Sequence, residues 1–268
     1  MMKTALITGG GGAIASEIAT RLDARGYQLI LADINEERMA TVAATLTRPA
    51  TCLRIDLSTA EGVAELCRKI EGDFAHLDLL VNNAGYVEPG DIADLDAPVL
   101  DRHININLIA PMQLTRAAAR VMRPRERGDI LSIVSMGGII ALKGSASYAA
   151  SKFGLRGYLT SVRSELAPHG VRIMGIFPSG VDTPMLRYEA THDGSPLNFV
   201  GKVFTAAEVA DACMKALDSG KLETYVPYGD SITSRLAGAF PWVIEKILPM
   251  FEKSGEKGRA KFRAERGI

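Results

Sequence analysis

The chain has 268 residues, of which 47% are apolar and 23% are charged, the balance of an ordinary globular protein. Its 31 basic side chains cancel its 31 acidic ones, so no overall charge draws it toward nucleic acid or an anionic membrane. Three scattered cysteines and four scattered histidines predict neither a disulfide framework nor a metal site, and they fit a reducing compartment such as the cytoplasm.

Two segments have some features of targeting signals. Residues 1–15 contain Lys3 and a small-residue triplet at 13–15, but the four consecutive glycines between them make a poor apolar helix. Residues 236–251 are apolar, yet they include two prolines and two charged side chains, and they fall short of the ~20 residues a membrane span needs. We therefore expect no cleaved signal and no transmembrane segment.

Short β-branched runs alternate with long helical patterns along the chain. The runs predict strands at 4–8, 28–33, 51–55, 77–82, 129–135, 171–177 and 223–227. The helical patterns include 13–26, 58–71, 98–122, 147–168 and 206–219. This alternation predicts an α/β fold, a doubly wound, Rossmann-like parallel seven-stranded sheet with helices on both faces. Without a repeat or a linker, residues 1–268 are expected to form one domain, with a core at 3–230 and a helical extension at 231–268.

A run of glycines follows the first predicted strand and opens a helix. It comprises Gly9, Gly10, Gly11 and Gly12, with Ala13, Ile14 and Ala15 directly after. Such a turn lets the backbone approach a pyrophosphate, and the helix N-terminus adds N–H donors and a positive dipole. Gly10-x-Gly12-x-x-Ala15 fits the general dinucleotide fingerprint. A tight turn without a ligand is the alternative.

Two acids follow the next two strands. Asp33 ends the second strand, where an acid accepts hydrogen bonds from the adenosine ribose of NAD, and no Lys or Arg lies in the glycine loop or directly after Asp33 to attract the phosphate of NADP. Its alternative role is a helix N-cap, for which Asn35 is better placed. Asp56, after the third strand, either caps the next helix or binds the adenine amino group.

Tyr148 and Lys152 lie four residues apart at the start of a long helical pattern, on one face. A phenol with a pKa near 10 is a poor acid–base catalyst at neutral pH, and an ammonium one turn away stabilises the phenolate. The pair alone also fits a solvated helix face. The other motifs decide between these interpretations: Ser135 ends the fifth strand, 82–85 reads Asn-Asn-Ala-Gly, Asn107 lies in the 98–122 helix, and 178–183 reads Pro-Ser-Gly-Val-Asp-Thr.

With these motifs in order, residues from about 3 to 227 resemble the short-chain dehydrogenase/reductase superfamily, in its shorter, single-domain branch. The resemblance assigns Tyr148 as proton donor or acceptor, Ser135 as the partner of the substrate oxygen, and Lys152 as ligand of the nicotinamide ribose. It also implies that Asn107 interrupts its helix around a water that links Lys152 to solvent.

The resemblance further assigns the cofactor contacts. Thr8-Gly9-x-x-x-Ala13-Ile14-Ala15 matches the family's glycine loop, with alanine at its second and third glycines, and Ser179 replaces another usual glycine. Asp56 and Leu57 are then expected beside the adenine, and the stretch from Asn83 through Ala84 to Gly85 is expected to line the cofactor. After Pro178, Val181 and Thr183 are expected to hold the carboxamide.

The sequence therefore predicts an NAD-dependent oxidoreductase that interconverts a secondary alcohol and a ketone. An NADPH-dependent ketoreductase and a non-catalytic NAD-sensing protein on the same fold are the alternatives. The family places its substrate lid at 185–204, where Leu186, Tyr188, Leu197 and Phe199 suggest a hydrophobic substrate, as do Phe240 and Trp242 in the extension. Packing of the lid and the extension alone explains these side chains equally well.

Two expectations concern surfaces. The amphipathic segment 241–251 is expected to cover the sheet, with a membrane or another subunit as alternatives. The resemblance implies a homodimer or homotetramer formed through the helices at 98–122 and 147–168.

Overall fold

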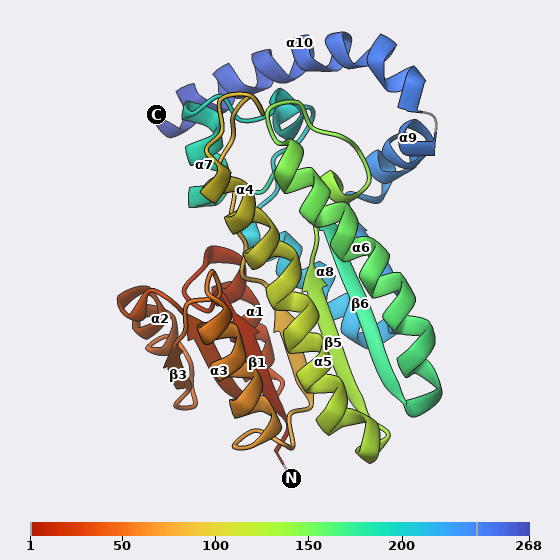
Figure 1. Cartoon of the computed structure of the whole chain (residues 1–268). Helices are drawn as coiled ribbons and strands as arrows, with labels where there is room; N and C mark the ends of the chain where they lie inside the picture. Colours follow the sequence, from red (N-terminus) through yellow and green to blue (C-terminus); the bar gives the residue numbers. More distant parts are fainter. Residues whose placement is uncertain (1, 240) are drawn as a thin grey trace.

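The predicted sheet is confirmed: seven parallel strands lie in the order β3-β2-β1-β4-β5-β6-β7 (Figure 1). The computed structural model describes residues 2–239 and 241–268. The strands are β1 (Thr4–Thr8), β2 (Gln28–Asp33), β3 (Thr51–Arg54), β4 (Leu79–Asn82), β5 (Gly128–Ile133), β6 (Val171–Pro178) and β7 (Glu223–Val226). The order reverses between β1 and β4, which creates a crevice at their carboxyl ends.

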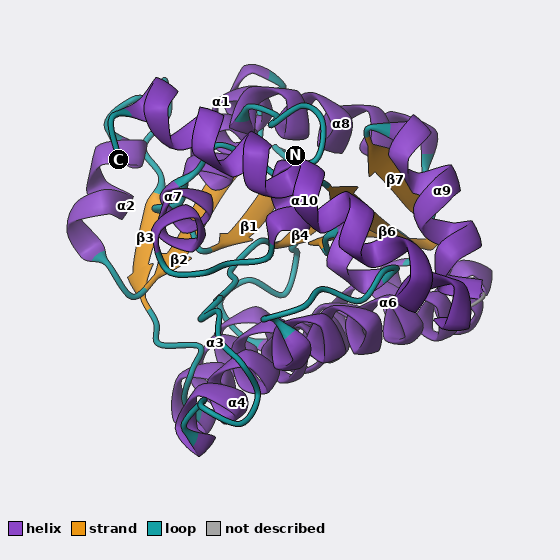
Figure 2. Ribbon diagram, turned by 90° about the horizontal axis from the view of Figure 1, so that it is seen from above, coloured by secondary structure: helices purple, strands orange, loops and turns teal. Residues whose placement is uncertain are grey.

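Helices cover both faces of the sheet (Figure 2). One layer contains α1 (Ala13–Ala24), α2 (Glu36–Ala43) and α8 (Ala206–Ser219), and the other contains α3 (Ala60–Glu71), α5 (Ala110–Met122) and α6 (Ala146–Leu166). Side chains alternate between the two layers along each strand. In β1, Ala5 and Ile7 pack on the first layer, while Leu6 packs on the second. The doubly wound α/β architecture thus follows from strands that are apolar on both faces.

The helix predicted at 98–122 is not continuous. It consists of α4 (Ala97–Ile104), a π-helical turn (Asn105–Ile109) and α5. Asn107 lies in this turn with no exposed surface. Its Oδ1 accepts a hydrogen bond from the Tyr86 N–H at 2.8 Å, and its Nδ2 donates to the Tyr86 carbonyl at 2.9 Å. A buried amide must be paired, and the π turn brings it to the backbone after β4.

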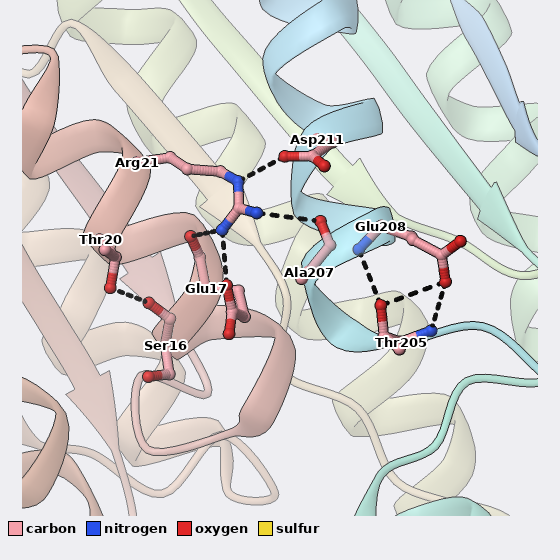
Figure 3. Close-up of polar contacts among 8 residues, drawn as sticks. All are labelled: Ser16, Glu17, Thr20, Arg21, Thr205, Ala207, Glu208 and Asp211. Carbon is pink, nitrogen blue, oxygen red and sulfur yellow. Dashed lines mark hydrogen bonds and ion pairs between the residues drawn. The ribbon is translucent and has the colours of Figure 1, made fainter.

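Arg21 joins α1 to α8 on the first layer (Figure 3). Its guanidinium pairs with Glu17 at 2.6 Å on its own helix and with Asp211 at 2.7 Å on α8. Thr205 and Glu208 form a capping box at the N-terminus of α8. These contacts fix α1, which follows the glycine loop, against α8, which follows the lid.

The lid and the extension lie beyond the carboxyl ends of the strands. The lid contains α7 (Pro184–Thr191) and a short helix (Pro196–Phe199), and the extension contains α9 (Tyr228–Ala239) and α10 (Pro241–Arg266). The expectation that 241–251 covers the sheet is wrong, because α10 crosses the lid and packs on α7 and the short helix instead (Figure 1). No helix among the described residues is long and apolar enough to span a membrane.

Some apolar residues of the lid pack against the extension, and others line a cavity. Leu186 and Phe199 pack against Phe262 of α10 as a small core, whereas Leu197 lines a cavity. Trp242 is 63% exposed, and Phe240 lies outside the described residues.

The core makes a direct stability prediction. Ile130 of β5 is fully buried, whereas Ile92, in the loop before α4, is 54% exposed. Ile130→Ala should lower the free energy of unfolding by about 2–5 kcal/mol, because it deletes buried methyl groups and leaves a cavity. Ile92→Ala should change it by about 0.5 kcal/mol or less. Urea denaturation of both variants checks this, and equal effects would contradict the described packing.

Candidate active site

Half of the predicted site residues meet at one small cavity at the carboxyl ends of the strands. The cavity has a volume of about 120 Å³. The predicted residues that line it are Ile14, Asn83, Gly85, Ser135, Tyr148, Lys152, Pro178, Val181 and Thr183. Lid residues Met185, Leu186, Glu189 and Asn198 close its other side. This is the crevice in which α/β sheets bind ligands.

Tyr148, in the first turn of α6, faces this cavity. Burial raises the pKa of its phenol well above the usual value, and the negative charge of Glu189 works in the same direction. The Ser135 hydroxyl acts in the opposite direction, since it stabilises the phenolate. The His103 ring packs edge-on with its centroid 6.3 Å from that of Tyr148. Burial therefore favours the protonated form of the phenol.

Lys152 lies one turn further along the same helix and is buried. Its Nζ donates to the Ile133 carbonyl of β5 at 3.1 Å and lies 5.7 Å from the centroid of the Tyr148 ring. Burial lowers the pKa of the Lys152 ammonium to about 8. Lys152 is therefore mostly charged at neutral pH, next to the phenol whose ionisation it favours.

Ser135 is held by the turn that follows β5. Its Oγ accepts a hydrogen bond from the Gly137 N–H at 2.9 Å. A Cβ at Gly137 would lie 3.2 Å from Cε1 of Tyr148 and 3.4 Å from the Ser135 Oγ. A glycine thus keeps the turn close enough to bring the two hydroxyls into one cavity.

The glycine loop lets a ligand approach the protein backbone closely. Gly9 has φ of +63°, and a Cβ there would lie 2.9 Å from Cα of Ala84. Gly12 is the N-cap of α1 and supplies no side-chain hydrogen bond, so the N–H groups of the first turn remain available. A phosphate bound here would meet these donors and the helix dipole. The loop therefore fits the pyrophosphate of a dinucleotide. The methyl group of Ala15 is buried in the core.

Asp33 lies against this loop. Its Oδ2 accepts from the Gly11 N–H and its Oδ1 from the Asn35 N–H, each at 2.9 Å. Asn35, not Asp33, caps α2 through the Arg38 N–H, so the structure removes the capping alternative for Asp33. The acid is fixed at the edge of the loop that would hold an adenosine ribose.

Arg38 is a residue that the sequence reasoning missed. A Cβ at Gly11 would lie 2.8 Å from the Cβ of Arg38, so α2 brings this residue against the glycine loop. Arg38 is exposed, and among the described residues its side chain makes no ion pair. Counting cations only next to Asp33 overlooks Arg38, which lies in the first turn of α2. The position of Arg38 three residues after the predicted N-cap Asn35 is the sequence signal that could have revealed it.

The remaining predicted contacts lie around the cavity. The Asp56 carboxylate accepts from the Ser58 N–H at 2.8 Å, and Thr59, not Asp56, caps α3. Leu57 follows and is buried. Thr183 caps α7 through the Leu186 N–H. Asn107 lies behind the cavity rather than in its wall, on the Tyr86 backbone.

A second, larger cavity adjoins the first. Its volume is about 480 Å³, and Ser135, Pro178, Ser179 and Asn198 line both. Its wall is mainly apolar and includes Ile140, Leu142, Leu197, Val200, Leu248 and Phe251. Leu248 and Phe251 belong to α10, so the extension forms part of the roof. The reactive hydroxyl groups thus open onto a space suited to a hydrophobic molecule.

The chain belongs to the short chain dehydrogenase family, whose model matches residues 3–194. Members of this family are oxidoreductases that use nicotinamide cofactors. The residues that line the small cavity lie within this matched region apart from Asn198, and the extension lies beyond it.

Three known proteins illustrate the likeness. The chain is 30% identical over 222 residues to (+)-borneol dehydrogenase 1 of Salvia officinalis, covering 79% of this chain and 85% of that protein. A short-chain dehydrogenase from Sphingobium yanoikuyae, solved with NADPH, has a TM-score of 0.79 at 25% identity, covering 91% and 96% of the two chains. The bulky-bulky ketone specific alcohol dehydrogenase from Comamonas testosteroni has a TM-score of 0.75 at 25% identity, covering 92% and 95%.

The hydrogen bonds that hold the glycine loop against the backbone after β4 lead to a testable prediction. The buried Thr8 hydroxyl accepts from the Asn83 N–H at 3.0 Å and from the Ala84 N–H at 3.1 Å. Thr8→Val should lower the free energy of unfolding by about 1–3 kcal/mol, because both donors lose their acceptor. Thr8→Ser keeps the hydroxyl and should cost less. Denaturant unfolding of both variants measures this, and equal losses would show that methyl packing dominates.

Proposed function

We propose that this chain is an NAD-linked dehydrogenase that interconverts a secondary alcohol and a ketone, with Tyr148 as general acid and base. One observation carries the proposal: Tyr148, Ser135 and Lys152 line the same cavity, next to a glycine loop that fits a dinucleotide. A phenol, a hydroxyl and an ammonium in that arrangement can hold an oxygen atom and transfer its proton.

The protein residues divide the work by their chemistry. A nicotinamide cofactor, when bound, supplies or accepts the hydride. In alcohol oxidation the Tyr148 oxygen takes the proton of the substrate hydroxyl, and in ketone reduction it returns one. Ser135 holds the same substrate oxygen. The Lys152 ammonium, one helical turn away, would stabilise the phenolate as a nearby cation does. Asn107 is proposed to support a water path to Lys152.

A hydrophobic substrate is the second part of the proposal. The apolar cavity of about 480 Å³ next to Ser135 supports it. The names of two similar proteins, one a borneol dehydrogenase and one specific for bulky-bulky ketones, point to the same class. Residues of the lid and of α10 together would then set the size of the accepted substrate.

NAD is the proposed cofactor because Asp33 stands where the 2′-phosphate of NADP would meet a carboxylate. Like charges in such contact typically cost several kcal/mol. An NADPH-dependent ketoreductase is the second candidate. Two observations favour it: Arg38 lies next to Gly11, and one similar structure holds NADPH.

The Tyr148 hydroxyl should be needed for turnover but not for cofactor binding. Tyr148→Phe should bind NAD nearly as the unmodified chain does, while losing most of its turnover, since only the transferable proton is removed. Tyr158→Phe is the matched control, because the Tyr158 hydroxyl donates to the Met112 carbonyl away from the cavity. Turnover of a panel of secondary alcohols and NAD calorimetry measure this. Retained turnover in Tyr148→Phe would refute the assigned mechanism, and a chain that binds NAD without any turnover would be a sensor.

The Lys152 ammonium should set the pH range of activity. Lys152→Met removes the cation that favours the phenolate, so the rise of alcohol oxidation with pH should move to higher pH. NAD binding should also weaken through loss of a ribose contact. Lys215→Met, on the exposed side of α8, should leave the profile unchanged. Rate profiles from pH 6 to 10 test this; an unshifted profile would make Lys152 only a structural residue.

Cofactor choice should depend on the balance between Asp33 and Arg38. The unmodified chain should bind NAD at least ~100-fold more tightly than NADP, the equivalent of a few kcal/mol of repulsion. Asp33→Ala should weaken NAD binding and strengthen NADP binding, and Arg38→Ala added to it should abolish the gain in NADP binding. Calorimetric titration of both cofactors measures this. Equal or tighter NADP binding by the unmodified chain would favour the ketoreductase.

A further inference from the structure

The lid places a carboxyl group in the catalytic cavity. Glu189 of α7 is 7% exposed and lines the small cavity together with Tyr148 and Ser135. Among the described residues that line either cavity, it is the only one with a carboxyl group. Burying a carboxyl group without an ion pair is costly, and an apolar side chain would cost less at this position. Its presence therefore points to a contact that the unliganded chain does not supply.

Only one oxygen of Glu189 is paired within the described chain. Nδ2 of Asn198 donates to its Oε1 at 3.0 Å, and no described donor contacts its Oε2. Burial raises the pKa of the carboxyl to about 7, while the hydrogen bond from Asn198 works in the opposite direction. Near neutral pH the free oxygen can therefore accept a hydrogen bond or, when protonated, donate one.

The lid is held in place by other contacts besides the hydrogen bond between Asn198 and Glu189. Leu186 and Ala190, on the same helix, pack on Phe199 and Phe262. The Tyr188 hydroxyl donates to Glu88 at 2.6 Å and ties α7 to the loop that follows β4. The lid therefore does not depend on Glu189 alone, and the second carboxyl oxygen of Glu189 is available to a ligand in the cavity.

We propose that Glu189, oriented by Asn198, binds a second hydroxyl group of the substrate, so that the enzyme favours diols and hydroxy ketones over simple alcohols and ketones. This rests on the proposed dehydrogenase function. An uncharged hydroxyl fits better than an ammonium, because Lys152 already places a positive charge in the same cavity. The larger cavity next to Ser135 is mainly apolar, so it fits the carbon skeleton of such a substrate.

The test compares alcohols that share a carbon skeleton. Cyclohexanol is paired with trans-1,2-cyclohexanediol, and 1-phenylpropan-1-ol with 1-phenylpropane-1,2-diol, with kcat/KM measured for each at saturating cofactor. The unmodified enzyme should favour the diol of a pair by at least about tenfold, because a buried polar group left unpaired rejects the analogue. Glu189→Met should reduce that ratio by at least about tenfold, and Asn198→Ala should reduce it in part. Glu65→Met, on the exposed face of α3, should leave it unchanged.

The possible outcomes distinguish failure of this inference from failure of the proposed dehydrogenase function. Oxidation of both members of each pair without preference would overturn the inference and leave the dehydrogenase intact. No oxidation of any of these alcohols with NAD or NADP would overturn both. An unchanged ratio in Glu189→Met, with weaker cofactor binding by calorimetry, would assign the carboxyl to the cofactor and overturn the inference.

Discussion

The site depends on two ionisable groups, the half-buried Tyr148 phenol and the buried Lys152 ammonium, being held one helical turn apart. Burial disfavours the charged form of each, so it raises the pKa of the phenol and lowers that of the ammonium to about 8. Their proximity opposes this for the phenol, because a nearby cation stabilises the phenolate. The pair therefore needs a rigid frame, which helix α6 and the Ile133 carbonyl of β5 provide.

That frame extends to the cofactor side of the sheet. The Thr8 hydroxyl links the end of β1 to the backbone after β4, and Gly9 allows these two segments to approach closely. Asn107 fixes the same stretch from behind, through the backbone of Tyr86. The glycine loop and the backbone after β4 thus support each other, while the lid lines the small cavity and α10 lines the larger one.

Local patterns predicted most of this arrangement, and long-range packing explains what they missed. The apolar runs and the turn residues after them located the strands and brought Ser135 and Tyr148 to one edge. The family resemblance implied the break at Asn107, which helical periodicity alone could not reveal, because the Tyr86 backbone, distant in sequence, imposes it. Long-range packing also sets the contact of Arg38 with Gly11 and the position of Glu189 beside Tyr148. The apolar side chains of α10 could cover a lid as well as a sheet, so their pattern alone did not show where this helix packs.

Hydride transfer itself tests the central claim most directly. A secondary alcohol deuterated at the carbinol carbon is incubated with the enzyme and NAD, and the reduced cofactor is analysed by mass spectrometry. The account predicts that deuterium appears on the cofactor in a one-to-one ratio with ketone formed, and that the Tyr148→Phe variant loses both products together. Ketone formed without deuterium in the cofactor, or NAD bound with no transfer from any alcohol of the panel, would contradict it.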